Sequence, residues 1–246
     1  LGDVYKRQEK LYVANLAKAN KELQELYDLE GSDKMQILKL LTRLRQLCLE
    51  PRLVYDNIDQ PSSKLKACME LIKTMQENKQ KVLLFSSFTS VLDLIAEECQ
   101  KAGITYYMLT GSTNKEDRRE LVSRFQKDDT TVFLISLKAG GTGLNLTSAE
   151  AVIHFDPWWN VSAQNQATDR AYRIGQKNNV QVFNLVMKDS VEEKIIELQK
   201  RKKELADMFV ENNSGGLSQM SKEDILSLFT CLLYTSPSPR DSTSSR

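Results

Sequence analysis

The sequence predicts an α/β fold in which helices cover a parallel sheet, with a helical segment before the sheet and a long helix after it. Short apolar runs have the length and composition of buried strands, at residues 81–85, 105–109, 131–135, 151–155 and 180–187. Longer amphipathic stretches flank and separate them, at residues 64–76, 90–101, 115–126 and 162–172. Strands that alternate with helices through short loops form parallel sheets covered on both faces.

The segment before the sheet has helical periodicity. Between residues 9 and 50 the apolar residues recur at the spacing of one helix face. Gly31-Ser32-Asp33 has turn chemistry and Pro51 ends the second stretch, so we expect two amphipathic helices. We assign residues 9–60 to this helical segment and residues 61–189 to the sheet domain.

The region after the sheet begins with a helix start signal. Ser190 followed by Glu193 matches a capping box and predicts a long helix that ends near residue 212. A short helix is expected at about 222–229, so residues 190–229 form a C-terminal helical part. Residues 1–8 and the Ser/Thr/Pro-rich residues 230–246 resemble translated adapter sequence, and we expect both ends to be non-native and outside the fold.

Composition sets limits on partners and chemistry. A net charge of +1 does not indicate wholesale coating of a polyanion, although a local rim of donors can still hold phosphates. Cys48, Cys68, Cys99 and Cys231 form no C-x-x-C pair, so we expect reduced structural thiols and no metal site. No apolar run reaches the length of a membrane span, and we expect a cytoplasmic protein without a membrane partner, associated with the nucleoid if the source is bacterial.

Hydroxyl groups and glycines follow the predicted strands. The carboxyl ends of parallel strands lie along one edge of a sheet, where ligands gather. Small donors at this edge can approach a phosphodiester backbone closely, although each Ser or Thr taken singly is more often a helix cap. We predict a surface that reads nucleic-acid backbone, made of Ser86, Ser87, Thr89, Thr110, Gly111, Ser112, Lys138, Gly140, Thr142 and Asn145.

Three motifs occur in a fixed order along the chain. They are Ala139-Gly140-Gly141-Thr142-Gly143-Leu144-Asn145-Leu146, then Asp156-Pro157-Trp158-Trp159-Asn160, then Asp169-Arg170-Ala171-Tyr172-Arg173-Ile174-Gly175-Gln176. That order resembles the second, C-terminal lobe of SWI/SNF-type helicase-like ATPases of superfamily 2. The sequence has no GxxxxGK[ST] phosphate loop and no Asp-Glu-x-His box. The resemblance therefore implies a fragment that lacks the first lobe, and we expect a bacterial source.

The resemblance carries expectations about the whole protein. It implies a RecA-like lobe that belongs to a DNA-dependent ATPase, which translocates on double-stranded DNA and remodels protein–DNA complexes. The implied cofactor is ATP with Mg, held mainly by the missing first lobe. The implied partners are double-stranded DNA, ATP, the first RecA-like lobe, and RNA polymerase or another DNA-bound protein. The fragment alone is expected to be inactive, because it cannot cradle the phosphates.

Two arginines are the predicted catalytic residues. Arg170 and Arg173 lie three residues apart, and by resemblance they are arginine fingers that stabilise charge on the transferred phosphoryl group. Gln166 lies four residues before Arg170, so on a helix it would share that face and either contact the nucleotide or orient the arginines, with plain solvent exposure as the alternative. Gly141 and Gly143 are implied nucleotide contacts as well. The competing interpretation of such an arginine pair is a solvated helix face with surface ion pairs.

The sequence also permits two other functions for the lobe. The lobe could belong to a strand-separating helicase of the same superfamily, or to a non-catalytic RecA-like module that binds nucleic acid or protein. We interpret His154, which lies in an apolar strand, as structural. For Trp158 and Trp159 packing is favoured over base stacking for at least one ring. The run Lys200-Arg201-Lys202-Lys203 is by default a solvated face.

Overall fold

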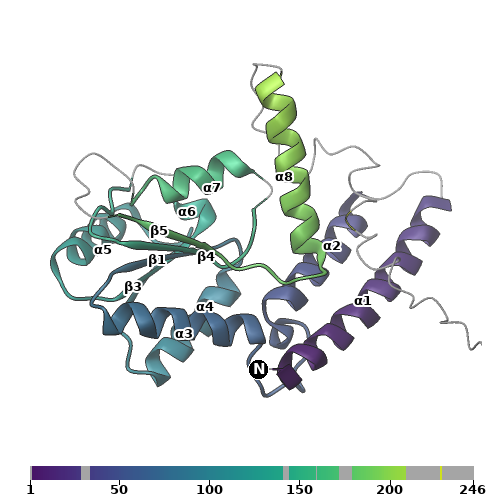
Figure 1. Ribbon diagram of the computed structural model, residues 1–246, viewed down its shortest axis with the longest axis horizontal. Coiled ribbons are helices and arrows are strands. Elements are labelled where there is room, and N and C mark those ends of the chain that lie inside the picture. The colour runs from purple at the N-terminus through teal and green to yellow at the C-terminus, as the bar shows by residue number, and fades with distance from the viewer. Residues whose placement is uncertain are drawn as a thin grey trace, which may run out of the picture.

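The computed structural model describes residues 2–28, 34–140, 144–158, 160–171, 179–208 and 228. Its sheet is five-stranded and parallel, with the strand order β2-β3-β1-β4-β5, and Figure 1 shows it on one side of three long helices. The strands are β1 (Val82–Ser86), β2 (Tyr106–Leu109), β3 (Val132–Ser136), β4 (Ala151–His154) and β5 (Gln181–Asn184). The predicted parallel sheet is therefore confirmed.

Strands β1, β3 and β4 are buried along their whole length, which explains their continuous apolar sequences. The edge strand β5 is largely exposed and is shorter than the predicted 180–187. Its pairing ends at Asn184 because its only neighbour, β4, ends at His154. Met187 packs instead into the helical cluster outside the sheet, so the prediction of a strand through residue 187 is wrong.

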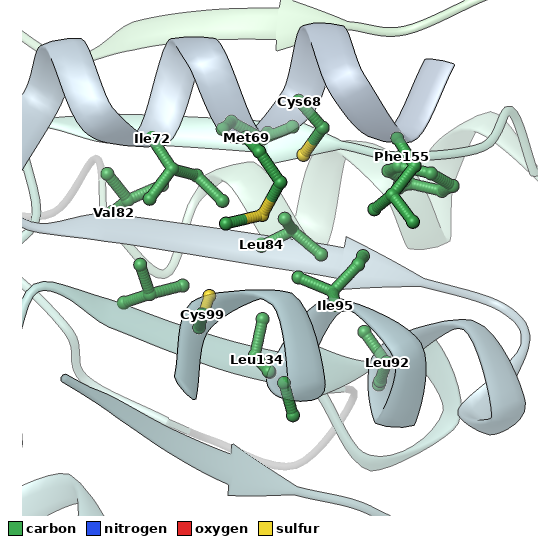
Figure 2. Close-up of a cluster of buried hydrophobic side chains, with 14 of the residues drawn as sticks. Cys68, Met69, Ile72, Val82, Leu84, Leu92, Ile95, Cys99, Leu134 and Phe155 are labelled. Atoms are coloured by element: carbon green, nitrogen blue, oxygen red, sulfur yellow. The ribbon is translucent and has the colours of Figure 1, made fainter. Parts of the chain in front are cut away.

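Alternate side chains of the central strands point to two separate cores. On one face, Leu84 and Leu134 pack against α3 (Ser63–Glu77) and α4 (Thr89–Lys101). Figure 2 shows this core, with Ile72 of α3 and Ile95 of α4 on opposite sides of the β1 side chains. Each such fully buried aliphatic side chain contributes roughly 1.5–3 kcal/mol to folding.

The opposite face of the sheet is covered by α5 (Lys115–Lys127), α6 (Leu137–Gly140) and α7 (Val161–Thr168). Phe85 and Phe133 belong to this core together with Phe125 of α5 and Ala167 of α7. The sheet is thus covered by helices on both faces, as a RecA-like lobe requires.

A separate cluster joins the helical segment to the last long helix. It involves α1 (Gly2–Asp28), α2 (Lys34–Leu49) and α8 (Val191–Met208), and a short 3-10 helix, η1 (Pro51–Leu53), follows α2. The hydroxyl of Tyr12 accepts a hydrogen bond from the backbone N–H of Val191 at 2.7 Å. In Figure 1 these three long helices lie together at one side of the sheet.

The N-terminal end of the helical segment differs from expectation, whereas most of the C-terminal end lies outside the described residues. Helix α1 begins at Gly2 rather than near residue 9. Gln8 is buried and its Nε2 donates to the carbonyl of Leu47 at 3.0 Å, so the expectation that residues 1–8 stand outside the fold fails at Gln8. The predicted helix end near residue 212 and the terminal helix at 222–229 lie outside the described residues, apart from Leu228, which is buried in the helical cluster.

The start of α8 is capped in a modified way. Ser190 Oγ accepts from the N–H of Glu192 at 3.2 Å, while Glu193 reaches back to the N–H of Asp189 at 2.8 Å. The glutamate therefore bonds one residue earlier than in a standard capping box. The predicted helix start is otherwise confirmed.

The described cysteines are free and buried, namely Cys48, Cys68 and Cys99. Burial raises the pKa of the thiols of Cys48 and Cys68, and it raises the pKa of Cys99 to about 12. Within the described ranges no group of His, Cys, Asp and Glu is placed to hold a metal ion, and no helix is long and apolar enough to cross a membrane.

Candidate functional site at the strand ends

The loops that leave the strands share one edge of the sheet. Ser86 at the end of β1 is in register with Ser136 at the end of β3, and His154 of β4 is in register with Phe85. The segments that follow these residues are therefore neighbours in space. This is the arrangement that the predicted backbone-reading surface needs.

The loop after β1 is fixed by Asp156, which follows β4. Asp156 accepts from Ser86 Oγ at 2.7 Å and from the N–H of Ser87 at 3.0 Å. Ser86 is fully buried, so its side chain cannot contact DNA and that prediction is wrong. Its hydroxyl instead satisfies a buried carboxylate.

Ser87 and Thr89 remain accessible. Ser87 is half-buried, and its hydroxyl also donates to Asp156. Thr89 is exposed at the first residue of α4, whose N-cap is Phe88 without a side-chain cap bond. Thr89 therefore does not serve as the helix cap, which removes the competing interpretation of its hydroxyl.

The loop after β2 is a tight turn that projects from the sheet edge. The N–H of Thr110 bonds to Thr113 Oγ1 at 3.0 Å, and the hydroxyls of Thr110 and Ser112 lie 2.8 Å apart. Asn114 caps α5 through the N–H of Asp117 at 2.8 Å. Asn114 supplies the helix cap, so Ser112 is not needed for it. Gly111 and Ser112 are both exposed at the surface.

Gly111 has room for a side chain within the protein. A Cβ added there would meet no heavy atom within 4 Å, and its φ is not in the left-handed region. The fold itself therefore does not require glycine at this position.

The loop after β3 leads into the glycine-rich turn. Lys138 is exposed on α6, and Asn145 is exposed on the far side of the turn. Gly140 ends α6, while Gly141, Thr142 and Gly143 lie outside the described residues. The carbonyl of Asn145 accepts from Gln126 Nε2 at 2.7 Å, which ties the end of the turn to α5.

A basic cavity lies beside these loops and was not predicted. It has a volume of about 630 Å³ and is lined by Thr113, Lys115, Arg118, Arg119, Val122, Ser123, Leu144 and Asn145. Arg118 Nη1 donates to the carbonyl of Ala139 at 3.1 Å, so α5 also supports the start of the glycine-rich segment. The signal in the sequence was the Arg118-Arg119 pair, in the helix that follows the second strand exit.

The segment that carries Arg170 differs from the prediction. Helix α7 ends at Thr168, and the backbone then tightens to bonds from Arg170 to Ala167 at 3.2 Å and from Ala171 to Thr168 at 3.1 Å. Gln166 is exposed, whereas Arg170 is only 6% exposed. The expectation that Gln166 and Arg170 share a helix face is therefore wrong, because the turn rotates Arg170 away.

The glycine-rich segment and the arginine segment are joined directly. The N–H of Leu146 donates to the carbonyl of Arg170 at 3.0 Å. Leu144, Leu146 and Ala171 are buried in the same core. The two segments are therefore in direct contact through backbone and packing. Arg173 lies outside the described residues.

His154 and Trp158 are in contact with other parts of the fold. His154 Nε2 lies 2.9 Å from Thr168 Oγ1, and its ring stacks on Phe85. Burial lowers the pKa of His154 to about 4, so the imidazole is neutral at pH 7. Trp158 is partly buried against the core of the α5, α6 and α7 face, which supports packing, and Trp159 lies outside the described residues.

An amide network, also not predicted, connects α7 and α8 to the loop after β4. Gln164 Oε1 accepts from the N–H of Trp158 at 3.3 Å, and Gln164 Nε2 donates to Asn184 Oδ1 at 2.9 Å. Gln199 of α8 donates to the carbonyl of Trp158. The long helix is thus bonded to the loop that leads into α7.

This geometry is that of a RecA-like lobe, with small donors at the strand ends and an arginine segment bonded to the glycine-rich segment. Residues 63–175 match the family model of the helicase conserved C-terminal domain. The chain is 38% identical over 208 residues to an uncharacterized ATP-dependent helicase of Mycoplasma pneumoniae, and 34% identical over 228 residues to the ISWI chromatin-remodelling complex ATPase ISW1 of Saccharomyces cerevisiae. These alignments cover 84% and 85% of the chain and 20% of each relative.

Solved structures give the same assignment. The C-terminal domain of the Sulfolobus solfataricus SWI2/SNF2 ATPase superposes with a TM-score of 0.71 at 26% identity, covering 91% of this chain and 92% of that domain. The core of that ATPase in complex with double-stranded DNA superposes with a TM-score of 0.72 at 29% identity, covering 90% of this chain and 47% of that core. The chain carries the C-terminal helicase lobe of the SNF2 family, and it spans about a fifth of the length of the curated relatives that it matches.

Proposed function

We propose that this lobe is the second motor lobe of a DNA-dependent ATPase that translocates on double-stranded DNA and remodels protein–DNA complexes. The hydrogen bond between Leu146 and Arg170 carries the proposal, because it joins the glycine-rich turn at the DNA-facing edge to the arginine segment. The solved DNA complex of the Sulfolobus ATPase core and the chromatin-remodelling name of the yeast relative support it.

Three polar residues and two glycines of this lobe act on the nucleotide. ATP with Mg is held mainly by the first lobe, and Arg170 and Arg173 stabilise the charge that develops on the transferred phosphoryl group. Arg170 is buried in this single lobe, so its side chain turns outward when the two lobes close on the nucleotide. Gln166, Gly141 and Gly143 contact the nucleotide across the same cleft.

The DNA side uses the accessible strand exits. Their hydroxyl and backbone N–H donors bind phosphates of the duplex without reading base sequence. The proposed contacts are Ser87, Thr89, Thr110, Gly111, Ser112, Lys138, Gly140, Thr142 and Asn145. The protein partner is RNA polymerase or another DNA-bound protein, which the moving motor displaces.

Replacement of Arg170 tests the catalytic assignment. In the full-length protein we expect Arg170→Ala to lower DNA-stimulated ATP hydrolysis by about 10³-fold or more, because an arginine finger supplies on the order of 10³ to 10⁵ in rate. Binding to a double-stranded oligonucleotide should stay within about threefold of wild type, or ~0.7 kcal/mol. The melting temperature of the variant is the control for folding, and Arg173→Ala should give the same kinetic defect. Near-normal turnover in a folded Arg170→Ala protein would contradict the finger role.

A further inference from the structure

Arg45 connects the helical segment to two of the strand exits. Its Nη2 donates to Asp156 Oδ2 at 2.8 Å, to Ser87 Oγ at 3.0 Å and to the carbonyl of Pro157 at 3.1 Å. Arg45 is 6% exposed and Asp156 is 1% exposed. Charge-assisted hydrogen bonds in such a buried place hold their geometry strongly.

The guanidinium group of Arg45 also contacts aromatic rings of both exits. It lies 4.9 Å from the ring centroid of Phe88, after β1, and 5.8 Å from that of Trp158, after β4. Asp156 in turn holds the N–H of Ser87. One side chain of α2 therefore contacts both loops, which Asp156 also joins directly.

We infer that Arg45 and Asp156 together are positioning residues for the DNA-facing loops, and that the helical segment controls the geometry of these loops through this pair. The inference rests on the proposed function, because Ser87 and Thr89 in the first of these loops are proposed DNA contacts. A loop that is already ordered loses less conformational freedom when it binds. Loosening the loops should therefore weaken the productive engagement of DNA more than it slows the chemical step.

A second buried ion pair provides a matched control. Lys64 Nζ lies 2.6 Å from Glu192 Oε1, and these residues are 8% and 0% exposed. Glu192 also accepts from the N–H of Met187 at 2.7 Å, so this pair joins α3 to the start of α8. Like the Arg45–Asp156 pair it is buried, and Lys64 lies 5.3 Å from the ring of Phe155, but its hydrogen bonds join α3 to the start of α8 and not to the loop after β1.

The experiment compares two charge-neutral double variants of the full-length protein. Arg45→Gln with Asp156→Asn removes the first pair, and Lys64→Gln with Glu192→Gln removes the second, so neither leaves a lone buried charge. ATP hydrolysis is measured as a function of the concentration of a double-stranded oligonucleotide, and melting temperatures are measured in parallel. We expect the first variant to raise the KM for DNA by about tenfold, which corresponds to ~1.4 kcal/mol, with a smaller change in kcat.

The control variant should keep the KM for DNA of the wild type, even where its melting temperature falls as far as that of the first variant. If the first variant has a wild-type KM for DNA, or if both variants raise it equally, the pair is only structural and the inference is overturned. Wild-type protein without DNA-stimulated hydrolysis would instead overturn the proposed function, so the two failures are distinguishable.

Discussion

At the scale of one residue, a substitution of Gly111 distinguishes an effect on folding from an effect on DNA binding. A Cβ at this position meets nothing in the protein, so Gly111→Ala should change the free energy of unfolding by less than about 0.5 kcal/mol. If DNA backbone lies against Gly111, the added methyl group should weaken DNA binding by about fivefold, or ~1 kcal/mol. Binding of labelled duplex by the full-length protein measures this effect.

Gly103 is the matched control for that substitution. It has a φ of +67° and lies before β2, at the opposite end of that strand from Gly111. Gly103→Ala should cost about 1 kcal/mol of stability, because a Cβ is strained in the left-handed region, and should leave DNA affinity unchanged. Unchanged DNA affinity in Gly111→Ala would contradict a close approach of DNA at that loop.

His154 should make stability depend on pH. Burial lowers its pKa to about 4, so the folded protein keeps the ring neutral while the unfolded chain takes up a proton below its ordinary value of 6.5. The free energy of unfolding should therefore fall by roughly 3 kcal/mol between pH 6.5 and pH 4, and little further below that. Urea unfolding across this range, compared with His154→Gln, isolates the contribution. An identical pH dependence in the variant would exclude His154 as the source.

The residues that the sequence did not reveal are those whose role depends on distant partners. Arg45 meets Asp156 across 111 positions of chain, and no local pattern indicates this pairing. Ser86 has the composition of a surface donor, yet the burial of the strand end and of Asp156 makes it internal. Arg170 was identified from its motif, but its burial was not, because it depends on where α7 ends.

At the scale of elements, the bounds of a strand are predicted more accurately where the strand is buried on both faces. The central strands were located within about one residue because burial on both faces produces continuous apolar runs. The exposed edge strand β5 lacks that constraint, and its predicted end was wrong. The end of α7 was missed because neither glycine nor proline marks it. After Thr168 the backbone bonds run from Arg170 to Ala167 and from Ala171 to Thr168, and Ala171 is buried in the core.

The Lys64–Glu192 pair anchors α8 to α3, and its loss should show in stability. Burial raises the pKa of Glu192, while the ammonium group of Lys64 opposes that shift and favours the carboxylate. Glu192→Gln leaves the Lys64 charge buried without its counter-ion, so it should destabilise the chain by about 3–5 kcal/mol. Urea unfolding of this chain measures the change. The double variant Lys64→Gln with Glu192→Gln should lose less than the single variant, and a purely additive result would show that the pair is not coupled.

At the scale of the whole molecule, three coupled parts surround the strand ends. The sheet domain presents the loops, α2 holds two of them through Arg45, and α8 reaches the loop after β4 through Gln199. The arginine segment is bonded to the glycine-rich turn at the same edge. This arrangement is consistent with the proposed function, in which the lobe exchanges force between a nucleotide on one side and DNA on the other and a first lobe supplies the phosphate-binding half.

The most direct test of this account is ATP hydrolysis by the full-length protein, titrated with double-stranded DNA, beside the same titration of the present chain alone. We expect the full-length protein to hydrolyse ATP faster as DNA is added, to saturate, and to lose the stimulation in Arg170→Ala. The present chain should show no hydrolysis at any DNA concentration, because the proposed function assigns the binding of the phosphates and Mg to the first lobe. Hydrolysis by the chain alone, or a full-length rate that does not respond to DNA, would contradict the account.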